Sequence, residues 1–426
     1  MQWESNILYR LKPKSEFTKN VLTLMTGTTI AQAIPVAISP ILTRLYSPKD
    51  FGVLALFVAI TSIFGSIANG RYELAIMLPK KDEDAINILA LGFIINVVLS
   101  LFLLLVVVVF HDNIVNLLNN KEIYPWLYLV PVSVFLMGLF NLLNYFNNRK
   151  KFYKDLAKAN IYKSIGMAGV QLSFGFLKTG AFGLISGQIF SQIISNTKLF
   201  FNVKKLGLFG GIRKVKMIAM GKRYKDFPKF TMWSVLANTL STHLTNILIS
   251  SFYSVKTLGF YSLAQRILGM PSSLIGGSIG QVFFEEATKE KHQTGKAIKT
   301  FNSTLKKLLI IAIPSFMLLY FIVEDLFGFV FGKEWVVAGN YAKILIPWFC
   351  IRFISSTLSI TNVVFEKNKN GLYINIILLI TSILSITFSA YFNLNVEKFL
   401  IIYSLLMGVE YAIFVVYYYC LSKGVI

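Results

Sequence analysis

Four ionisable side chains stand inside long apolar stretches of the chain: His243, Arg266, Arg352 and Glu410. An ionisable group within the hydrocarbon of a membrane costs about 2.5–3.5 kcal/mol to insert, so such groups usually face a bundle interior or a wet cavity. Arginine suits phosphate because its planar guanidinium donates two parallel hydrogen bonds. The pattern predicts a cationic cavity in which Arg352, Arg266 and His243 bind an anionic substrate. Glu410 is the candidate carboxylate for coupling to an ion.

The same residues also have a purely structural interpretation. Arg352 and Glu410 could pair with each other and only fix the packing of their helices. A lone histidine such as His243 could hydrogen-bond a neighbouring helix. Both interpretations are left open by the sequence.

The charges of the first half of the chain lie at helix ends. Arg44, at the outer end of the first apolar run, is a further candidate for substrate binding. Arg71 and Glu73 flank Tyr72 at the inner end of the second run and could form a gate at the cytoplasmic mouth. Arg and Tyr at such a position also serve as interfacial anchors.

The composition places these residues in a membrane protein. The chain has 426 residues, of which 55% are hydrophobic and 15% charged, and its mean hydropathy is +0.62. Many apolar runs reach about 20 residues, the length that spans a bilayer as a helix. A β-barrel requires strands that alternate polar and apolar residues, and runs such as residues 101–110 do not alternate. The fold class is therefore an all-α polytopic membrane protein.

Several kinds of chemistry are excluded or disfavoured. Only Cys350 and Cys420 are present, and no Ser-His-Asp arrangement, phosphate-binding glycine loop or Cys/His cluster appears. We therefore predict no catalytic residue, no metal site and no cofactor. The acidic run Asp82-Glu83-Asp84 fits the first turn of a helix better than the metal site of a glycosyltransferase, for which no soluble domain is present.

The apolar runs predict twelve spans, six in each half. They are expected at residues 20–43, 51–70, 86–110, 124–146, 157–177, 182–202, 228–252, 258–283, 305–331, 340–365, 371–392 and 397–421. This divides the chain into a basic N-terminal segment (1–19), an N-lobe (20–202), a basic cytoplasmic linker (203–227), a C-lobe (228–421) and a short tail (422–426).

Alternate loops differ in charge. One set, which includes residues 149–154 and 203–227, holds clusters of Lys and Arg, whereas the other set holds Arg44, Lys49 and otherwise single lysines. Because basic loops remain in the cytoplasm, both termini are predicted to be cytoplasmic. The net charge of +22 is thus explained by topology and by attraction to membrane lipids, and we predict no nucleic-acid partner.

A short motif occurs twice. Residues 46–52 read Tyr-Ser-Pro-Lys-Asp-Phe-Gly and residues 253–259 read Tyr-Ser-Val-Lys-Thr-Leu-Gly, so that Tyr, Ser, Lys and Gly recur at the same spacing. Each copy lies between two apolar runs and is expected to form a tight loop between two spans. A repeat of about half the chain suggests a duplicated bundle.

The first of these copies also carries a resemblance. The run from Leu42 through Thr-Arg-Leu-Tyr-Ser-Pro-Lys-Asp-Phe to Gly52, followed by Arg71-Tyr-Glu-Leu-Ala-Ile-Met-Leu-Pro79 and the acidic residues 82–84, resembles the polysaccharide repeat-unit flippases (Wzx type) of the multidrug/oligosaccharidyl-lipid/polysaccharide exporter superfamily. The motifs are confined to about residues 20–90, whereas the number of spans and the loop lengths agree over nearly the whole chain.

This resemblance implies two six-helix lobes that form a V around a central cavity with alternating access. The implied substrate is an undecaprenyl-pyrophosphate-linked glycan, moved to the outer leaflet of a bacterial cytoplasmic (inner) membrane for O-antigen, capsule or similar synthesis. A polysaccharide polymerase and a chain-length regulator would be further partners. The protein would not be an enzyme.

Two other functions remain as alternatives. A cation-coupled multidrug antiporter of the same superfamily would use Glu410 for coupling, but a cavity for cationic drugs should be acidic. A membrane polymerase or glycosyltransferase usually needs a sizeable outer loop with catalytic residues, and the outer loops here are short.

Overall fold

The computed structural model describes residues 16–425, with side chains from residue 23 onward except at position 368. The basic segment expected at residues 1–19 therefore lies largely outside the described residues. All regular structure in residues 16–425 is helical, and the expected all-α fold class is confirmed.

Within residues 16–425, twelve long helical segments correspond in order to the twelve expected spans, although the third and the eighth extend well beyond the predicted boundaries. In the first half they are α2 with α3 (Glu16–Ala37 and Ser39–Leu45), α4 (Pro48–Gly65), α6 (Asp82–Leu117), α7 (Val130–Arg149), α8 (Tyr153–Phe176) and α9 (Ala181–Lys205). In the second half they are α11 (Met232–Phe252), α12 with α13 (Val255–Pro271 and Gly277–Thr294), α14 (Ile298–Phe331), α15 (Val336–Leu358), α17 (Asn368–Tyr391) and α18 (Val396–Ser422). Short elements connect them: α5 (Tyr72–Ala75), η1 (Lys121–Leu129), α10 (Lys214–Arg223), η4 (Ser272–Gly276), η5 (Lys333–Trp335) and α16 (Thr361–Val364).

Proline interrupts the first and the eighth spans. Helix α2 contains Pro35 and ends at Ala37, and α3 restarts with Pro40 near its beginning. Helix α12 ends at Pro271 and continues through the π-helical turn η4 into α13. Because proline removes one backbone donor and displaces the preceding turn, these are the positions at which a spanning helix bends.

Nine stretches of the described chain are long and apolar enough to cross a membrane by length and composition alone. Helices α8, α9 and α11 fall outside this set because they carry more polar side chains. In the N-lobe some of these join helices: Gln171 of α8 donates to the carbonyl of Leu184 (3.1 Å), and Asn196 of α9 donates to the carbonyl of Leu136 (2.9 Å). These two side chains are therefore engaged in helix packing.

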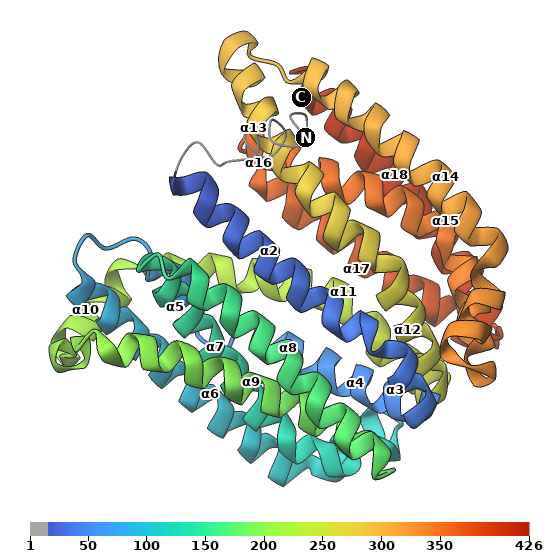
Figure 1. Cartoon of the computed structure of the whole chain (residues 1–426), viewed down its shortest axis with the longest axis horizontal. Helices are drawn as coiled ribbons and strands as arrows, with labels where there is room; N and C mark the ends of the chain where they lie inside the picture. Colours follow the sequence, from blue (N-terminus) through green and yellow to red (C-terminus); the bar gives the residue numbers. More distant parts are fainter. Residues whose placement is uncertain (1–15, 426) are drawn as a thin grey trace, which may run out of the picture.

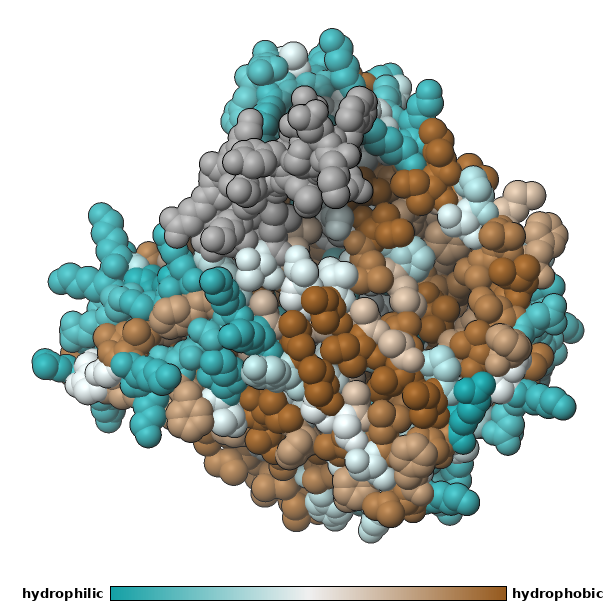
Figure 2. Space-filling view, in the orientation of Figure 1, coloured by the Kyte–Doolittle hydropathy of each residue, from teal (hydrophilic) through white to brown (hydrophobic). Residues whose placement is uncertain are grey.

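The long helices form two lobes, the N-lobe of α2 to α9 and the C-lobe of α11 to α18 (Figure 1). The lobes converge where α3, α4 and α12 meet and diverge toward the end that carries α10 and α13 (Figure 1). We refer to the converging end, which holds the turns at residues 46–47 and 253–254, as the closed end. Much of the visible surface of both lobes is apolar, as Figure 2 shows, and hydrophilic residues gather at the end that carries α10.

The duplicated motif starts a helix in the same way in both halves. The Ser47 hydroxyl caps α4 by accepting from the backbone N–H of Asp50, and the Ser254 hydroxyl caps α12 by accepting from that of Thr257 (3.0 Å). Asp50 completes a capping box by accepting from the backbone N–H of Ser47 (2.9 Å). The expected tight loops between spans are thus present, and the shared Ser supplies a helix start in each.

The two copies of the motif then pack against each other at the closed end. A Cβ added to Gly52 would overlap the carbonyl oxygen of Val255, and one added to Gly259 would overlap the carbonyl oxygen of Pro48. Helices α4 and α12 therefore approach each other backbone to backbone, which only glycine permits.

Side chains from both lobes extend this closure. The indole Nε1 of Trp335 in the C-lobe donates to the carbonyl of Thr43 in the N-lobe (3.0 Å). The Trp335 ring also makes an edge contact with Phe51, at 5.0 Å between centroids. Asn120 donates to the Ser250 hydroxyl across the lobes at 2.7 Å. Since hydrogen bonds and aromatic contacts accompany the glycine contact, the lobes are firmly joined at this end.

Candidate functional site

A cavity of about 570 Å³ lies between the lobes. It is lined by α4 from the N-lobe and by α11, α12, α15, α17 and α18 from the C-lobe. Phe51, which packs on Trp335 at the closed end, is one of its lining residues. The volume falls within the usual range of small-molecule sites.

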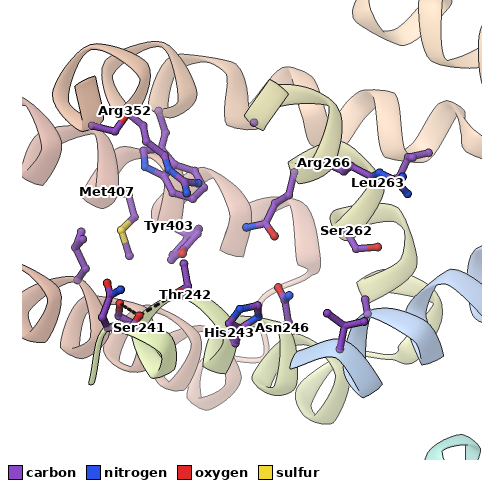
Figure 3. A pocket seen from close by; sticks show the side chains of 18 of the residues that line it. Ser241, Thr242, His243, Asn246, Ser262, Leu263, Arg266, Arg352, Tyr403 and Met407 are labelled. Carbon is purple, nitrogen blue, oxygen red and sulfur yellow. Dashed lines mark hydrogen bonds between the residues drawn. The ribbon is translucent and has the colours of Figure 1, made fainter. Parts of the chain in front are cut away.

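Three of the residues singled out in the sequence come together here. His243 on α11, Arg266 on α12 and Arg352 on α15 all line the cavity. Figure 3 shows them on three different helices around one space, with Tyr403 and Met407 of α18 close to Arg352. Residues more than 100 positions apart in the chain thus form one site.

The guanidinium of Arg352 is positioned by aromatic rings of its own helix. It lies 5.5 Å from the ring centroid of Trp348 and 5.2 Å from that of Phe349. These residues are four and three positions earlier, so they occupy the same face of α15. A guanidinium over aromatic faces is attracted by their quadrupoles and keeps its edge free for hydrogen bonds. Arg352 is thus oriented without being neutralised.

The cavity is basic. No Asp or Glu is among its lining residues. Among the described side chains, neither Arg266 nor Arg352 has a carboxylate within ion-pair distance. Two positive charges without protein counterions, in a site partly shielded from water, attract an anionic ligand more strongly than they would in bulk solvent.

Helix α11 supplies a neutral polar wall. Asn238, Ser241, Thr242 and Asn246 line the cavity beside His243. The hydroxyls of Ser241 and Thr242 donate to the Asn238 carbonyl at 2.8 and 2.7 Å, which satisfies them inside an apolar environment. Helix α4 supplies the apolar counterpart with Leu54, Ala55 and Val58 among other residues. This polar stripe explains why α11 is less apolar than a typical span.

Glu410 lies outside this site. It is half-buried in α18, and one of its carboxylate oxygens accepts a hydrogen bond from the Thr381 hydroxyl of α17. The other oxygen is buried without a hydrogen-bond partner among the described residues. The structure does not bring Glu410 into an ion pair with Arg352, so the structural pairing considered from the sequence is not formed. Its role in ion coupling stays a prediction.

Arg44 is also separate from the cavity. It lies exposed in the last turn of α3 and does not line the space between the lobes. The sequence grouped it with Arg266 and Arg352 by residue type, and the structure does not bring them together.

Arg71 and Glu73, the residues considered for a gate, form an ion pair with each other within the N-lobe. The Arg71 Nη1 lies 2.9 Å from Glu73 Oε1, and the Glu73 side chain is only 2% exposed. Gly70 and Arg71 have φ values of 57° and 63°, and this left-handed turn costs a non-glycine residue about 1–2 kcal/mol. Burial raises the pKa of Glu73, while the nearby Arg71 opposes that shift.

Lys163 is an intramembrane charge that was not among the residues expected from the sequence. Lys163 lies near the middle of α8, and its Nζ is 4.7 Å from the ring centroid of Phe140 on α7. No carboxylate pairs with it among the described ion pairs. The signal was available, because Lys163 falls inside the fifth expected span at residues 157–177. The interior of the N-lobe therefore contains a charge, whereas the sequence had indicated that the charges of this half lie only at helix ends.

A family profile described as a polysaccharide biosynthesis protein matches residues 41–339. A succinoglycan biosynthesis transport protein of Rhizobium meliloti (strain 1021) is 21% identical over 306 residues, which make up 70% of this chain and 59% of that protein. The alignment thus spans well under two thirds of this relative.

Solved structures share the fold. The lipid II flippase MurJ in an inward closed conformation superposes with a TM-score of 0.72 at 17% identity, covering 93% of this chain and 86% of that one. A multidrug resistance transporter of the MATE family in an inward-facing conformation superposes with a TM-score of 0.69 at 11% identity, covering 92% and 93%. At these identities the likeness extends to the fold, and it agrees with the expected arrangement of two six-helix lobes.

Proposed function

The chain belongs to the family of polysaccharide biosynthesis proteins, and from this premise we propose that it is a flippase for undecaprenyl-pyrophosphate-linked oligosaccharide repeat units. It moves them from the cytoplasmic to the outer leaflet for O-antigen, capsule or a related surface polysaccharide. The observation that carries the proposal is the cavity lined by Arg266 and Arg352 without any carboxylate.

The chemistry of the substrate fits the lining of the cavity. A pyrophosphate presents several anionic oxygens, which a guanidinium binds through paired charge-assisted hydrogen bonds. The sugars offer hydroxyl groups, which match the amides and hydroxyls of α11. These hydroxyls and charges would lose their water in hydrocarbon at a cost of several kcal/mol, so they need a polar space between the lobes. The polyprenyl chain stays in the bilayer.

The direction of transport follows from the closed end. If the basic loops face the cytoplasm, the closed end faces outside and the lobes diverge inward, so the conformation accepts substrate from the cytoplasmic leaflet. Outward release then requires α4 and α12 to separate while the inner ends approach. Arg71 and Glu73 lie near that inner mouth and serve as its gate in this scheme.

The test compares charge removal with charge retention. Arg266→Ala with Arg352→Ala should abolish surface polysaccharide in a host that depends on the protein and leave complete lipid-linked repeat units on the cytoplasmic face. The matched double change to Lys should keep part of the export, because it preserves both charges while losing the planar geometry. Lys121→Ala, an exposed residue at the start of η1, is the control.

Two results would contradict the proposal. Normal export from the double alanine variant, at normal expression, would remove the arginines from the mechanism. Repeat units that reach the outer face but remain unpolymerised in a deletion strain would point to a polymerase instead. The multidrug antiporter is disfavoured by the same cavity, because two unpaired arginines repel cationic drugs.

A further inference from the structure

A second hollow lies on the outer wall of the C-lobe. It has a volume of about 490 Å³ and is bounded by α14, α15 and α18. Two of its lining residues, Ile401 and Leu405 of α18, are 46% and 64% exposed. They precede Tyr403 and Met407 of the central cavity by two positions each, which is about 200° around a helix. The hollow, here called the lateral groove, therefore faces away from the central cavity.

The lining of the lateral groove changes from polar to apolar along all three helices. Nearest the closed end it presents Glu324 of α14, Asn340 and Lys343 of α15, and Glu397 of α18. Farther from that end it presents Tyr320, Ile344, Pro347, Ile401 and Leu405. From Glu397 to Leu405 the helix advances about 12 Å. The groove thus has a charged head and an apolar tail aligned with the spanning helices.

The charged head is only partly satisfied by the protein. Lys343 Nζ lies 3.2 Å from Glu324 Oε1 and 5.5 Å from the ring centroid of Tyr320. Asn340 Nδ2 donates to Glu397 Oε1 at 2.8 Å. The ion-paired side chains of Lys343 and Glu324 remain 34% and 41% exposed. Each retains room for another partner, and the two carboxylates outnumber the one ammonium.

The charged groups of the lateral groove lie beside exposed apolar side chains. Glu324 precedes the end of α14 at Phe331 by seven residues, which is about 10 Å of helix. Exposed apolar side chains lie on both sides of it along α14, including Phe321 at 69% and Phe329 at 84%, and the adjacent Asp325 is charged and exposed. In a membrane about 30 Å thick, a charged pair this close to the end of a spanning helix is expected near the boundary between hydrocarbon and headgroups, where charged groups are stabilised by polar partners.

We propose that the lateral groove binds a glycerophospholipid with a primary ammonium headgroup, in the leaflet at the closed end. The ammonium donates to Glu324 and Glu397, the phosphate accepts from Lys343, and an acyl chain lies along Ile401 and Leu405. An anionic headgroup would place its charge against two carboxylates. A quaternary ammonium has no N–H to donate. This site is independent of the substrate cavity and of the proposed transport.

The test measures retained lipid on the full chain. The purified protein is given equal amounts of phosphatidylethanolamine, phosphatidylglycerol and phosphatidylcholine with identical acyl chains, and bound lipid is counted by native mass spectrometry. Phosphatidylethanolamine should be preferred. Lys343→Gln and Glu397→Gln should each reduce its retention about tenfold, as expected for one charge-assisted contact. Lys49→Ala is the matched control, because Lys49 forms a similarly exposed ion pair with Glu122 (2.8 Å) at the same end of the N-lobe.

A second variant separates folding from binding. Leu405→Trp fills the apolar tail of the groove and leaves every charge in place, so it should reduce retention while the lipid-free protein melts at an unchanged temperature. Equal retention of phosphatidylglycerol, or retention that none of the three groove variants lowers, would overturn the proposal.

Discussion

Gly52 and Gly259 occupy equivalent positions of the two motif copies, and each lies against the backbone of the other's helix. The carbonyl of Val255 fills the space beside Gly52, and the carbonyl of Pro48 fills the space beside Gly259. Pro48 and Val255 are themselves equivalent positions of the repeat. The contact is therefore reciprocal, and it joins the two lobes where the cavity ends.

Gly52→Val should weaken the closed end. Its Cβ would meet a backbone carbonyl that cannot rotate away, so α4 and α12 must separate. We expect the variant to shift toward conformations opened at that end, which a pair of spin labels across the lobes would detect as longer distances. Gly169→Ala is the control, because an added Cβ there meets nothing within 4 Å and alanine favours a helix by up to about 1 kcal/mol. Unchanged distances for Gly52→Val would contradict the role of this contact.

Lys163→Met should make the protein more stable and less active. The lysine is an intramembrane charge whose described partner is one aromatic ring, and removing it should raise the free energy of unfolding by about 1 kcal/mol or more. An ionisable side chain inside a membrane span is often functional. Denaturation in detergent and an export assay measure the two effects. Lys163→Arg, which keeps the charge, should restore export. If Lys163→Met exports normally, the residue has no part in transport.

The buried Glu73 predicts a specific dependence of stability on pH. Because burial raises its pKa above the unfolded value, the folded protein is penalised when this carboxyl is ionised. The penalty is complete above the folded pKa and disappears as the pH falls toward about 4.3, the unperturbed value for glutamate. Wild-type protein should therefore gain stability over this window relative to Glu73→Gln.

The measurement for Glu73 is the melting temperature of both proteins across a pH series. Glu122→Gln, which removes an exposed carboxylate at the other end of the lobe, should follow the wild type. Parallel plots of melting temperature against pH for wild type and Glu73→Gln would contradict this prediction. They would show that the Glu73 carboxyl titrates in the same way in the folded and the unfolded protein.

Glu410→Gln tests ion coupling separately from substrate binding. Glutamine can still accept from Thr381 but cannot gain or lose a proton. If Glu410 couples transport to an ion, export by the variant should no longer respond to the ion gradient. Thr381→Val, which removes the donor and leaves the carboxylate, should retain the response with a shifted pH dependence. A variant Glu410→Gln with a normal gradient response would exclude this residue as the coupling site.

The sequence predicted most of the fold because hydropathy encodes span length directly. It also placed His243, Arg266 and Arg352 in one cavity, since insertion cost forces charged side chains inward. Arg44 shows the limit of residue type alone: an arginine at a helix end can satisfy its charge in the headgroup region, and this one lies apart from the cavity.

What the sequence did not predict depends on helix rotation and on neighbours in space. The partner of Glu410 is Thr381, 29 positions away on α17, and hydropathy does not select it over Arg352. The contact of Lys163 with Phe140 likewise depends on how α7 and α8 are turned. The sequence shows both glycines as members of a repeat. That they contact each other's helices is seen only from the way α4 and α12 cross.

The reciprocal contact gives the chain a property usually found in assemblies of separate subunits. An interface in which both members present the same patch is isologous, and a two-fold axis relates its halves. Helices α4 and α12 meet in this manner although they belong to one polypeptide. The closed end thus has the self-complementary design of a homodimer interface, although a mutation in one polypeptide changes only one of the two equivalent motif positions.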